Sequence, residues 1–412
     1  MDFYSKAIKE FGQSFGTAIV PTSIGQNYVT VVGPERKKIR KRNSYIVVAQ
    51  NRDYQTVNPS TTIAAALLNG GQCEFRIESG IADVIDYCMI KLQVSNATGG
   101  AVVLAPAQML INSIQVWAQN GSNLLNTVYG HELYLGNAFL PRNEYENFCD
   151  GLGLTTAYAS AATSIANGST ATLYIPIFQP FMPSKLHPAG LQGNLLVRVL
   201  FNTTALTHVS GSLLDVSNCV LNLRSRDQPN ALQSEQENFY TGPIPLSLCF
   251  QNIQRQSVVM TLAASSTYSI TLSGINGIVS TLFWTIRPAA ITASNCITYY
   301  APQDFDIQTS DGSSLIGFTR RTGTEALWDY AECFDNLFRK NVNFNCVPFS
   351  NDPVNDYANG SNYGYMPFTS FEKLSFTTAS TLVGASYTID IIAFVHDNIN
   401  IVNGRAQSMK SQ

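Results

Sequence analysis

The feature of this chain that most constrains its fold is a strand–turn–strand pattern that occurs twice. Each copy has an apolar run, a strand-like segment about twenty residues later, a polar turn, and then two apolar residues that begin the next strand, Leu124-Leu125 in the first copy and Leu315-Ile316 in the second. These segments are Ile85–Val94, Ile114–Trp117 and Asn120-Gly121 in the first copy, and Ile278–Ile286, Phe305–Gln308 and Asp311-Gly312 in the second. Asn-Gly or Asp-Gly between apolar runs is a strong hairpin signal. The duplication predicts two similar β units in one chain.

The two copies continue to match beyond the turns. Val128–Phe148 and Thr324–Lys340 follow the turns, and their apolar residues recur at steps of three and four, which predicts helices. Strand-like runs then end each unit, at Leu173–Phe178 and Leu195–Phe201 in the first and at Val342–Phe349 and Tyr387–Val395 in the second. A Gly/Pro-rich segment, Tyr240–Pro245, separates them. We therefore expect two domains, 44–240 and 241–412, each of ordinary size.

From Tyr45 onward, short runs of Val, Ile, Leu, Phe and Tyr alternate with turn residues, as is typical of β-sandwiches and β-barrels. Only 13% of the residues are charged, about half the usual share. Low charge suits a protein with large interfaces, because unpaired charges are costly to bury. The composition favours an all-β structural or binding protein.

Residues 1–43 differ from the rest of the chain. They hold eight Lys/Arg and three Asp/Glu, whereas the remainder holds seventeen and twenty-five, so the bulk of the protein is mildly acidic and is not a general nucleic-acid binder. Phe3, Ala7, Phe11 and Phe15 are spaced four apart, which predicts an amphipathic helix over residues 2–19. We interpret residues 1–43 as an N-terminal arm.

A basic run lies near the end of this arm. Six of seven consecutive residues are basic: Arg36, Lys37, Lys38, Arg40, Lys41 and Arg42. Such a run binds an anionic partner or is solvated. Candidate partners are an internal membrane, through its lipid headgroups, the genome, through its phosphates, or neighbouring subunits. We expect Phe3, Phe11, Phe15 and the six basic residues to make these contacts.

Motifs that would indicate catalysis are missing. The four His show no metal-binding spacing, and the chain contains no phosphate-binding loop and no nucleophile elbow. His131 precedes Glu132 in a predicted helix, where a surface ion or hydrogen-bond role is expected. Asp304, Asp306 and Asp311 offer oxygens to a hard cation such as Ca²⁺, but a strand edge and an Asp-Gly turn account for them better. We expect no enzyme activity, catalytic residue, cofactor or metal site.

The eight Cys include no CxxC pair and mostly lie in apolar runs, which predicts buried free thiols. The first residues do not have the pattern of a signal peptide, and no apolar run is long enough for a transmembrane helix. Folding in a reducing cytosol, such as the cytoplasm of a host cell, is the simplest expectation.

The order of strand, Asn-Gly or Asp-Gly turn, helix, Tyr174–Phe178 and Leu195–Phe201 resembles double jelly-roll major capsid proteins of tectivirus-like phages and large DNA viruses. The resemblance covers about 45–404, with Leu195–Phe201 as the last strand of the first roll and Tyr387–Asp397 as its equivalent in the second. It implies an all-β fold of two tandem eight-stranded jelly-roll sandwiches with short helices in loops and an N-terminal arm.

The resemblance also implies a function. Three copies would form a pseudo-hexagonal capsomer that tiles an icosahedral virion shell. The implied partners are the chain itself, as a homotrimer and in neighbouring capsomers, and penton and minor capsid proteins.

Two other functions stay open. Tandem jelly rolls also serve as virion spike or lectin-like carbohydrate-binding proteins, and the aromatic residues of Tyr357–Tyr365 would suit glycan stacking. A glycosidase would need two paired carboxylates, and nothing in the sequence pairs them.

Overall fold

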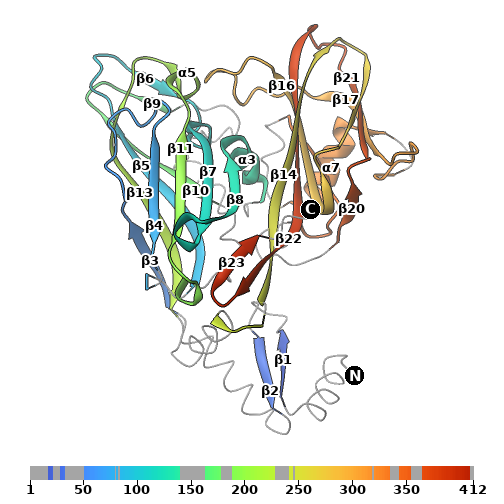
Figure 1. Ribbon diagram of the computed structural model, residues 1–412. Helices are drawn as coiled ribbons and strands as arrows, with labels where there is room; N and C mark the ends of the chain where they lie inside the picture. The colour runs from blue at the N-terminus through green and yellow to red at the C-terminus, as the bar shows by residue number, and fades with distance from the viewer. Residues whose placement is uncertain are drawn as a thin grey trace.

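The computed structural model describes residues 17–21, 28–32, 51–78, 80–81, 84–139, 163–177, 188–227, 241–244, 246–317, 320–334, 343–353 and 364–408. Two β-sandwiches stand side by side with their long axes roughly parallel (Figure 1). A hairpin of β1 (Thr17–Pro21) and β2 (Tyr28–Val32) lies beyond their lower end. No helix among the described residues has the length and apolar character needed to cross a bilayer.

The first sandwich consists of two four-stranded antiparallel sheets, with strand orders β10-β5-β13-β3 and β4-β11-β7-β8. A short sheet, β12-β6-β9, lies at its upper end (Figure 1). The strands are β3 (Asn51–Val57), β4 (Gln72–Ile77), β5 (Val84–Ser95), β6 (Val102–Leu104), β7 (Ile111–Ala118), β8 (Asn123–Tyr129), β9 (Thr163–Ile165), β10 (Thr170–Ile177), β11 (Leu195–Phe201), β12 (His208–Ser210) and β13 (Asp215–Asp227). The helices are η2 (Ala107–Leu110), η3 (Gln119–Gly121), α3 (Gly130–Leu135), η4 (Gly136–Phe139), η5 (Pro188–Gly190) and α5 (Thr204–Thr207).

The second sandwich has sheets of order β14-β22-β16-β19 and β15-β21-β17-β18, with β20 and β23 added to the first of them. Its strands are β14 (Leu246–Leu262), β15 (Thr267–Thr271), β16 (Asn276–Pro288), β17 (Pro302–Gln308), β18 (Arg321–Thr322), β19 (Asn345–Pro348), β20 (Met366–Thr369), β21 (Lys373–Thr378), β22 (Ala385–Val402) and β23 (Arg405–Ser408). Its helix is α7 (Gly323–Cys333).

The two sandwiches have the same topology. When the short extra strands β6, β9, β12, β20 and β23 are set aside, each sandwich has eight strands. In both, the first, eighth, third and sixth strands form one sheet, and the second, seventh, fourth and fifth form the other. Two four-stranded sheets joined in this way make a jelly roll. The predicted fold of two tandem eight-stranded jelly rolls is confirmed.

Alternating side chains explain why these segments form sandwich strands. In β4, Cys73, Phe75 and Ile77 are fully buried, while the residues between them point outward, as a two-residue period requires. On the outer face, Arg198 of β11 donates to Glu74 of β4 at 3.0 Å, and the two residues are direct partners in the register. The sequence thus places apolar atoms between the sheets and charges on the outside.

Several sequence predictions need correction. Leu195–Phe201 is the seventh strand of the first roll, not the last, and pairs with β4 and β7. The last strand is β13, the true equivalent of β22. Leu315 and Ile316 precede the short strand β18 instead of forming it. The turn glycines Gly121 and Gly312 are confirmed, with φ of 93° and 91°, values that favour glycine.

The helix predictions are partly confirmed. α7 lies inside the predicted segment Thr324–Lys340 except at its first residue. α3 begins at Gly130 because strand β8 continues to Tyr129, and the rest of the predicted helix, 140–148, lies outside the described residues. The helix predicted over residues 2–19 is wrong at its end. The residues from Thr17 onward have high strand propensity and form strand β1, which pairs with β2. The domain limits 1–43, 44–240 and 241–412 stay predictions.

Candidate functional site

The contact between the two sandwiches combines packed aromatic rings with ionisable side chains and a cavity. The first sandwich contributes α3 and η4, which follow β8 and face the sheet β14-β22-β16-β19 of the second (Figure 1). Gly130 starts α3 against η2, where a Cβ would lie 2.3 Å from the carbonyl oxygen of Ile111. Only glycine allows this approach, so the sequence fixes where the helix lies.

Aromatic rings form the apolar part of this contact. Phe139, at the end of η4, is 4% exposed. Its ring centroid lies 4.7 Å from that of Phe394 on β22, and 5.4 Å from those of both Phe283 on β16 and Phe334 at the end of α7. Phe344 is 5.2 Å from Phe283 in the same cluster. Phe139 of the first sandwich is therefore inserted among rings of the second, and one hydrophobic cluster runs through both.

Charged side chains lie beside the aromatic cluster. His131 Nδ1 is 3.9 Å from Asp390 Oδ2 of β22, and Asp390 also pairs with Arg287 of β16. Glu132 Oε1 is 3.7 Å from the guanidinium of Arg255 on β14. The two adjacent residues of α3 thus each face a charged residue of the other sandwich.

The sequence suggested a surface role for His131, but this prediction is wrong, because its side chain is only 14% exposed. The neighbouring Glu132 also holds the helix start, because its Oε2 accepts the backbone N–H of Tyr129 at 2.8 Å. The ring of Tyr129 is covered by the guanidinium of Arg255, 3.1 Å from the ring centroid, which adds a cation–π contact between the halves.

Burial changes the acidity of these groups. It raises the pKa of Glu132 to about 7, because the charged carboxylate loses its hydration. It lowers the pKa of His131 to about 4 for the same reason, against the opposing effect of Asp390. Burial also acts to raise the pKa of Asp390, but the charges of His131 and Arg287 and a hydrogen bond from Ser257 hold it below its ordinary value. Glu132 and His131 are therefore the groups here that titrate in mildly acidic solution.

A cavity of about 290 Å³ lies at this contact, lined by residues of α3, β14, β16 and β22, including His131, Glu132, Arg255, Arg287 and Asp390. A second hollow of about 450 Å³ lies between β8 and β14 and shares part of the same lining. Every charged group named in the lining faces an opposite charge or the His131 ring. The arrangement joins the two sandwiches by ionisable side chains, whose charges depend on pH, beside packed rings.

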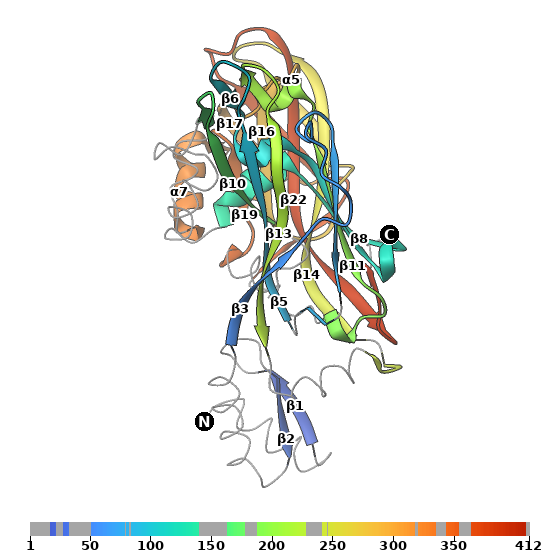
Figure 2. The same cartoon turned by 90° about the vertical axis from the view of Figure 1, so that its left-hand side faces the viewer.

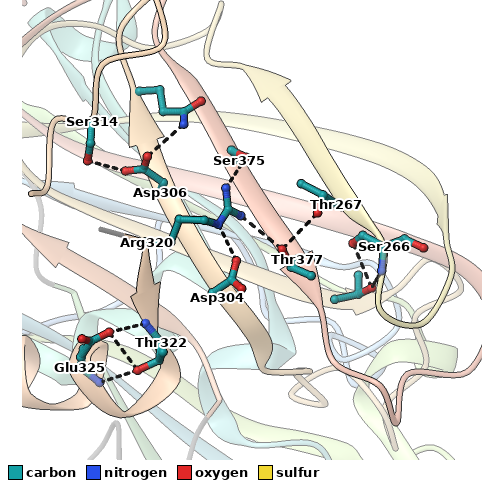
Figure 3. Close-up of polar contacts among 12 residues, drawn as sticks. Ser266, Thr267, Asp304, Asp306, Ser314, Arg320, Thr322, Glu325, Ser375 and Thr377 are labelled. Carbon is teal, nitrogen blue, oxygen red and sulfur yellow. Dashed lines mark hydrogen bonds and ion pairs between the residues drawn. The ribbon is translucent and has the colours of Figure 1, made fainter. Parts of the chain in front are cut away.

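The carboxylates considered as cation ligands are used in hydrogen bonds, and Figure 3 shows those of Asp304 and Asp306. Asp304 accepts from Arg320 at 2.6 Å, and Asp306 accepts from Ser314 at 2.6 Å and from Gln308 at 3.0 Å. Asp311 accepts from Thr309 and from the backbone N–H of Ser313, which lowers its pKa. No group of three or more His, Cys, Asp or Glu side chains suited to a metal ion occurs among the described residues. These aspartates stabilise β17 and its turn.

Figure 3 also shows the start of α7. The Thr322 hydroxyl accepts the backbone N–H of Glu325 at 3.4 Å, and the Thr322 backbone N–H donates to the Glu325 carboxylate at 2.7 Å. This is a capping box, which satisfies two backbone donors at the helix start.

Thr322→Ala should therefore lower the free energy of unfolding by about 1 kcal/mol, measured by urea denaturation. Thr322→Ser keeps the accepting hydroxyl and should lose much less. If the alanine and serine variants are equally stable, the cap contributes nothing.

The arm residues predicted as contacts lie outside the described residues: Phe3, Phe11, Phe15, Arg36, Lys37, Lys38, Arg40, Lys41 and Arg42. The same holds for 357–363 of the aromatic segment considered for glycan stacking. The prediction of free thiols is confirmed for the described cysteines, which are buried at Cys73, Cys88, Cys219, Cys296 and Cys346 and half-buried at Cys333.

No protein-family model and no curated protein matches this chain, but several solved structures do. PBCV-1 VP54, fitted into a reconstruction of the virophage Sputnik, superposes with a TM-score of 0.65 at 12% identity, over 88% of this chain and 97% of that one. The Faustovirus major capsid protein gives 0.64 at 9% identity, over 86% and 91%. The STIV MCP gives 0.51 at 13% identity, over 85% and 97%. The chain shares the double jelly-roll fold of these proteins along most of its length.

Proposed function

We propose that this chain is the major capsid protein of an icosahedral virus, and that three copies form a pseudo-hexagonal capsomer. The observation that carries the proposal is the identical strand order of the two sandwiches. Two similar units in one chain become six around a threefold axis, and six units can occupy a near-sixfold position in a shell. Closed cyclic assemblies of this kind are common among homo-oligomers.

The contact between the sandwiches supports this proposal. Phe139 and its aromatic partners are almost fully buried, so the two rolls are held as one block. A rigid two-roll block is what a shell tile requires, because each copy must present its rolls at a fixed angle. The fold shared with the Faustovirus major capsid protein and with PBCV-1 VP54 agrees with a structural, non-enzymatic role.

On this proposal the protein is made in the host cytoplasm and is located in the virion capsid. Its partners are two further copies in the trimer, neighbouring capsomers, and penton and minor capsid proteins. Light scattering after size exclusion tests the first of these: we expect a mass three times that of the 45.0 kDa chain. A mass of one chain at every concentration would contradict the trimer.

We propose further that the arm binds an anionic partner inside the shell, either an internal membrane or the genome. Replacing the basic residues of Arg36–Arg42 by Gln should weaken binding to vesicles containing phosphatidylserine, or to duplex DNA, by at least about 100-fold at low salt, given roughly 1 kcal/mol for each basic residue near an anionic surface. A Lys6→Gln, Lys9→Gln variant serves as the control outside the run. Unchanged binding to both probes would remove the electrostatic role.

A further inference from the structure

The duplicated topology relates the helices of the two sandwiches. α3 follows β8, the fifth strand of the first roll, and α7 follows β18, the fifth strand of the second. Each of these helices precedes the sixth strand of its roll, β10 or β19. α3 and α7 are therefore equivalent elements, and what α3 contacts indicates what α7 is built to contact.

α3 and the adjoining η4 contact the sheet β14-β22-β16-β19 of the next roll, through Phe139 and the charges of His131 and Glu132. The equivalent sheet of the first roll is β10-β5-β13-β3. In this chain that sheet lies on the side away from the second roll (Figure 1), where β3 and β13 face the viewer in Figure 2. Among the described residues, one such helix-on-sheet contact is formed, and α7 and the β10-β5-β13-β3 sheet provide the elements for a second.

The outer face of α7 has the properties of an interface. Ala326 and Tyr330 are buried and hold the inner face of the helix. Trp328 is 75% exposed, and Glu325 and Glu332 lie three residues before and four residues after it, both exposed. These three side chains share one stripe of the helix, and α7 stands out from the body of the molecule in Figure 2. A large exposed aromatic side chain between two acids is typical of a binding surface.

The outer face of the β10-β5-β13-β3 sheet is chemically complementary to the exposed residues of α7. Tyr174 of β10, Lys91 of β5 and Val220 of β13 are direct partners in the register and so lie in one row across the sheet. Their chain neighbours, such as Ile90 and Leu92, are fully buried between the sheets, which places this row on the outside. Arg224, four residues along β13 from Val220, faces the same way. Val220 itself is only 5% exposed, so the accessible part of the row is Tyr174 and Lys91, which are half-buried. The Tyr174 ring can pack against an indole, and Lys91 and Arg224 supply cations for the two acids.

We propose that the α7 stripe of Glu325, Trp328 and Glu332 binds the outer face of the β10-β5-β13-β3 sheet of a second copy of this chain, with Trp328 against Tyr174. This inference rests on the proposed function and identifies the surfaces that join the copies. The contact is head-to-tail, because the helix and the sheet are different surfaces, and such a contact closes into a ring when the rotation between copies divides a full turn. Three copies give six helix-on-sheet contacts, three within chains and three between them.

The first test compares the assembly of the full chain with that of Trp328→Ala by light scattering over a dilution series. The substitution is expected to raise the concentration at which the assembly dissociates by about 30-fold, as for a central aromatic interface residue. Phe371→Ala is the matched control, since Phe371 is another exposed aromatic residue, 67% exposed, and should leave the assembly unchanged. Glu332→Lys should weaken the assembly, and adding Lys91→Glu should restore part of the loss.

The second test places the photo-crosslinker p-benzoylphenylalanine at position 328 of the otherwise unchanged chain. Crosslinked peptides should come from β5, β10 or β13 of another copy. If the chain with its natural sequence is a single copy at all concentrations, the proposed function itself fails. If it is a trimer, but Trp328→Ala dissociates like the natural chain and the crosslinks lie elsewhere, only this inference is overturned.

Discussion

Replacing Phe139 with Ala is expected to lower the free energy of unfolding by about 3–5 kcal/mol, the usual cost of removing a buried Phe from a packed core. The Phe139 ring lies within 5.4 Å, centroid to centroid, of three rings of the second sandwich. The loss should therefore fall mainly on the contact between the halves. A urea unfolding curve followed by tryptophan fluorescence and by circular dichroism measures it.

The shape of that curve carries further information. Trp117 belongs to the first sandwich, and Trp284 and Trp328 to the second, so tryptophan fluorescence reports on both halves. If Phe139 joins them into one cooperative unit, the variant should unfold in two steps where the natural chain unfolds in one. Phe371→Ala is the control and should change stability by less than about 0.5 kcal/mol. A loss below about 1 kcal/mol for Phe139→Ala would show that the aromatic cluster does not hold the rolls together.

Stability between pH 4 and pH 7 is expected to change in opposite directions in two variants of α3. The pKa of Glu132 is raised to about 7, so its contribution to stability is fully present below its ordinary value of 4.5 and is lost as the pH rises through 7. The pKa of His131 is lowered to about 4, so its contribution is present above its ordinary value of 6.5 and is lost as the pH falls through 4. In the natural chain the two effects largely cancel.

Each substitution removes one of the two effects. His131→Gln leaves Glu132, so the variant should gain stability, by up to about 3 kcal/mol, as the pH falls from 7.5 to 4.5. Glu132→Gln leaves His131, and this variant should lose a similar amount over the same range. The glutamine at 132 can still accept the backbone N–H of Tyr129, so the helix start is kept.

Urea midpoints at several pH values measure this pair of effects. The quantity to follow is the difference in urea midpoint between the two variants at each pH, because all other titrating groups are common to both. Asp390, whose pKa is held below its ordinary value, is present in both variants. Parallel pH curves for the two variants would contradict the assigned protonation states.

The sequence predicted the fold where local patterns repeat. The runs that became β5 and β16, the turns at Gly121 and Gly312, and the start of α7 are all set by residues close together in the chain. The last strand of the first roll was missed because β13 carries Asn218, Asn222 and Arg224 among its apolar residues, which interrupts the apolar run. Leu195–Phe201, in which only Arg198 interrupts the apolar residues, was taken for it.

The contact between the rolls could not be predicted in the same way. His131 and Glu132 face Asp390 and Arg255 only because two sheets far apart in the chain pack together, and no sequence pattern encodes that distance. One signal was present in the sequence. His131 and Glu132 directly precede the apolar residues 133–135 of the same helix, and ionisable residues in such a helix are expected to be buried and therefore paired. The arm contacts stay a prediction.

Electron microscopy of the purified protein, by two-dimensional class averages viewed along the symmetry axis, shows whether this doubled chain forms a six-cornered tile. We expect a hexagonal outline with six similar lobes and threefold symmetry, in which each chain contributes two adjacent lobes. Two-lobed single particles, or assemblies with another symmetry, would contradict the claim that this doubled chain forms a six-cornered tile.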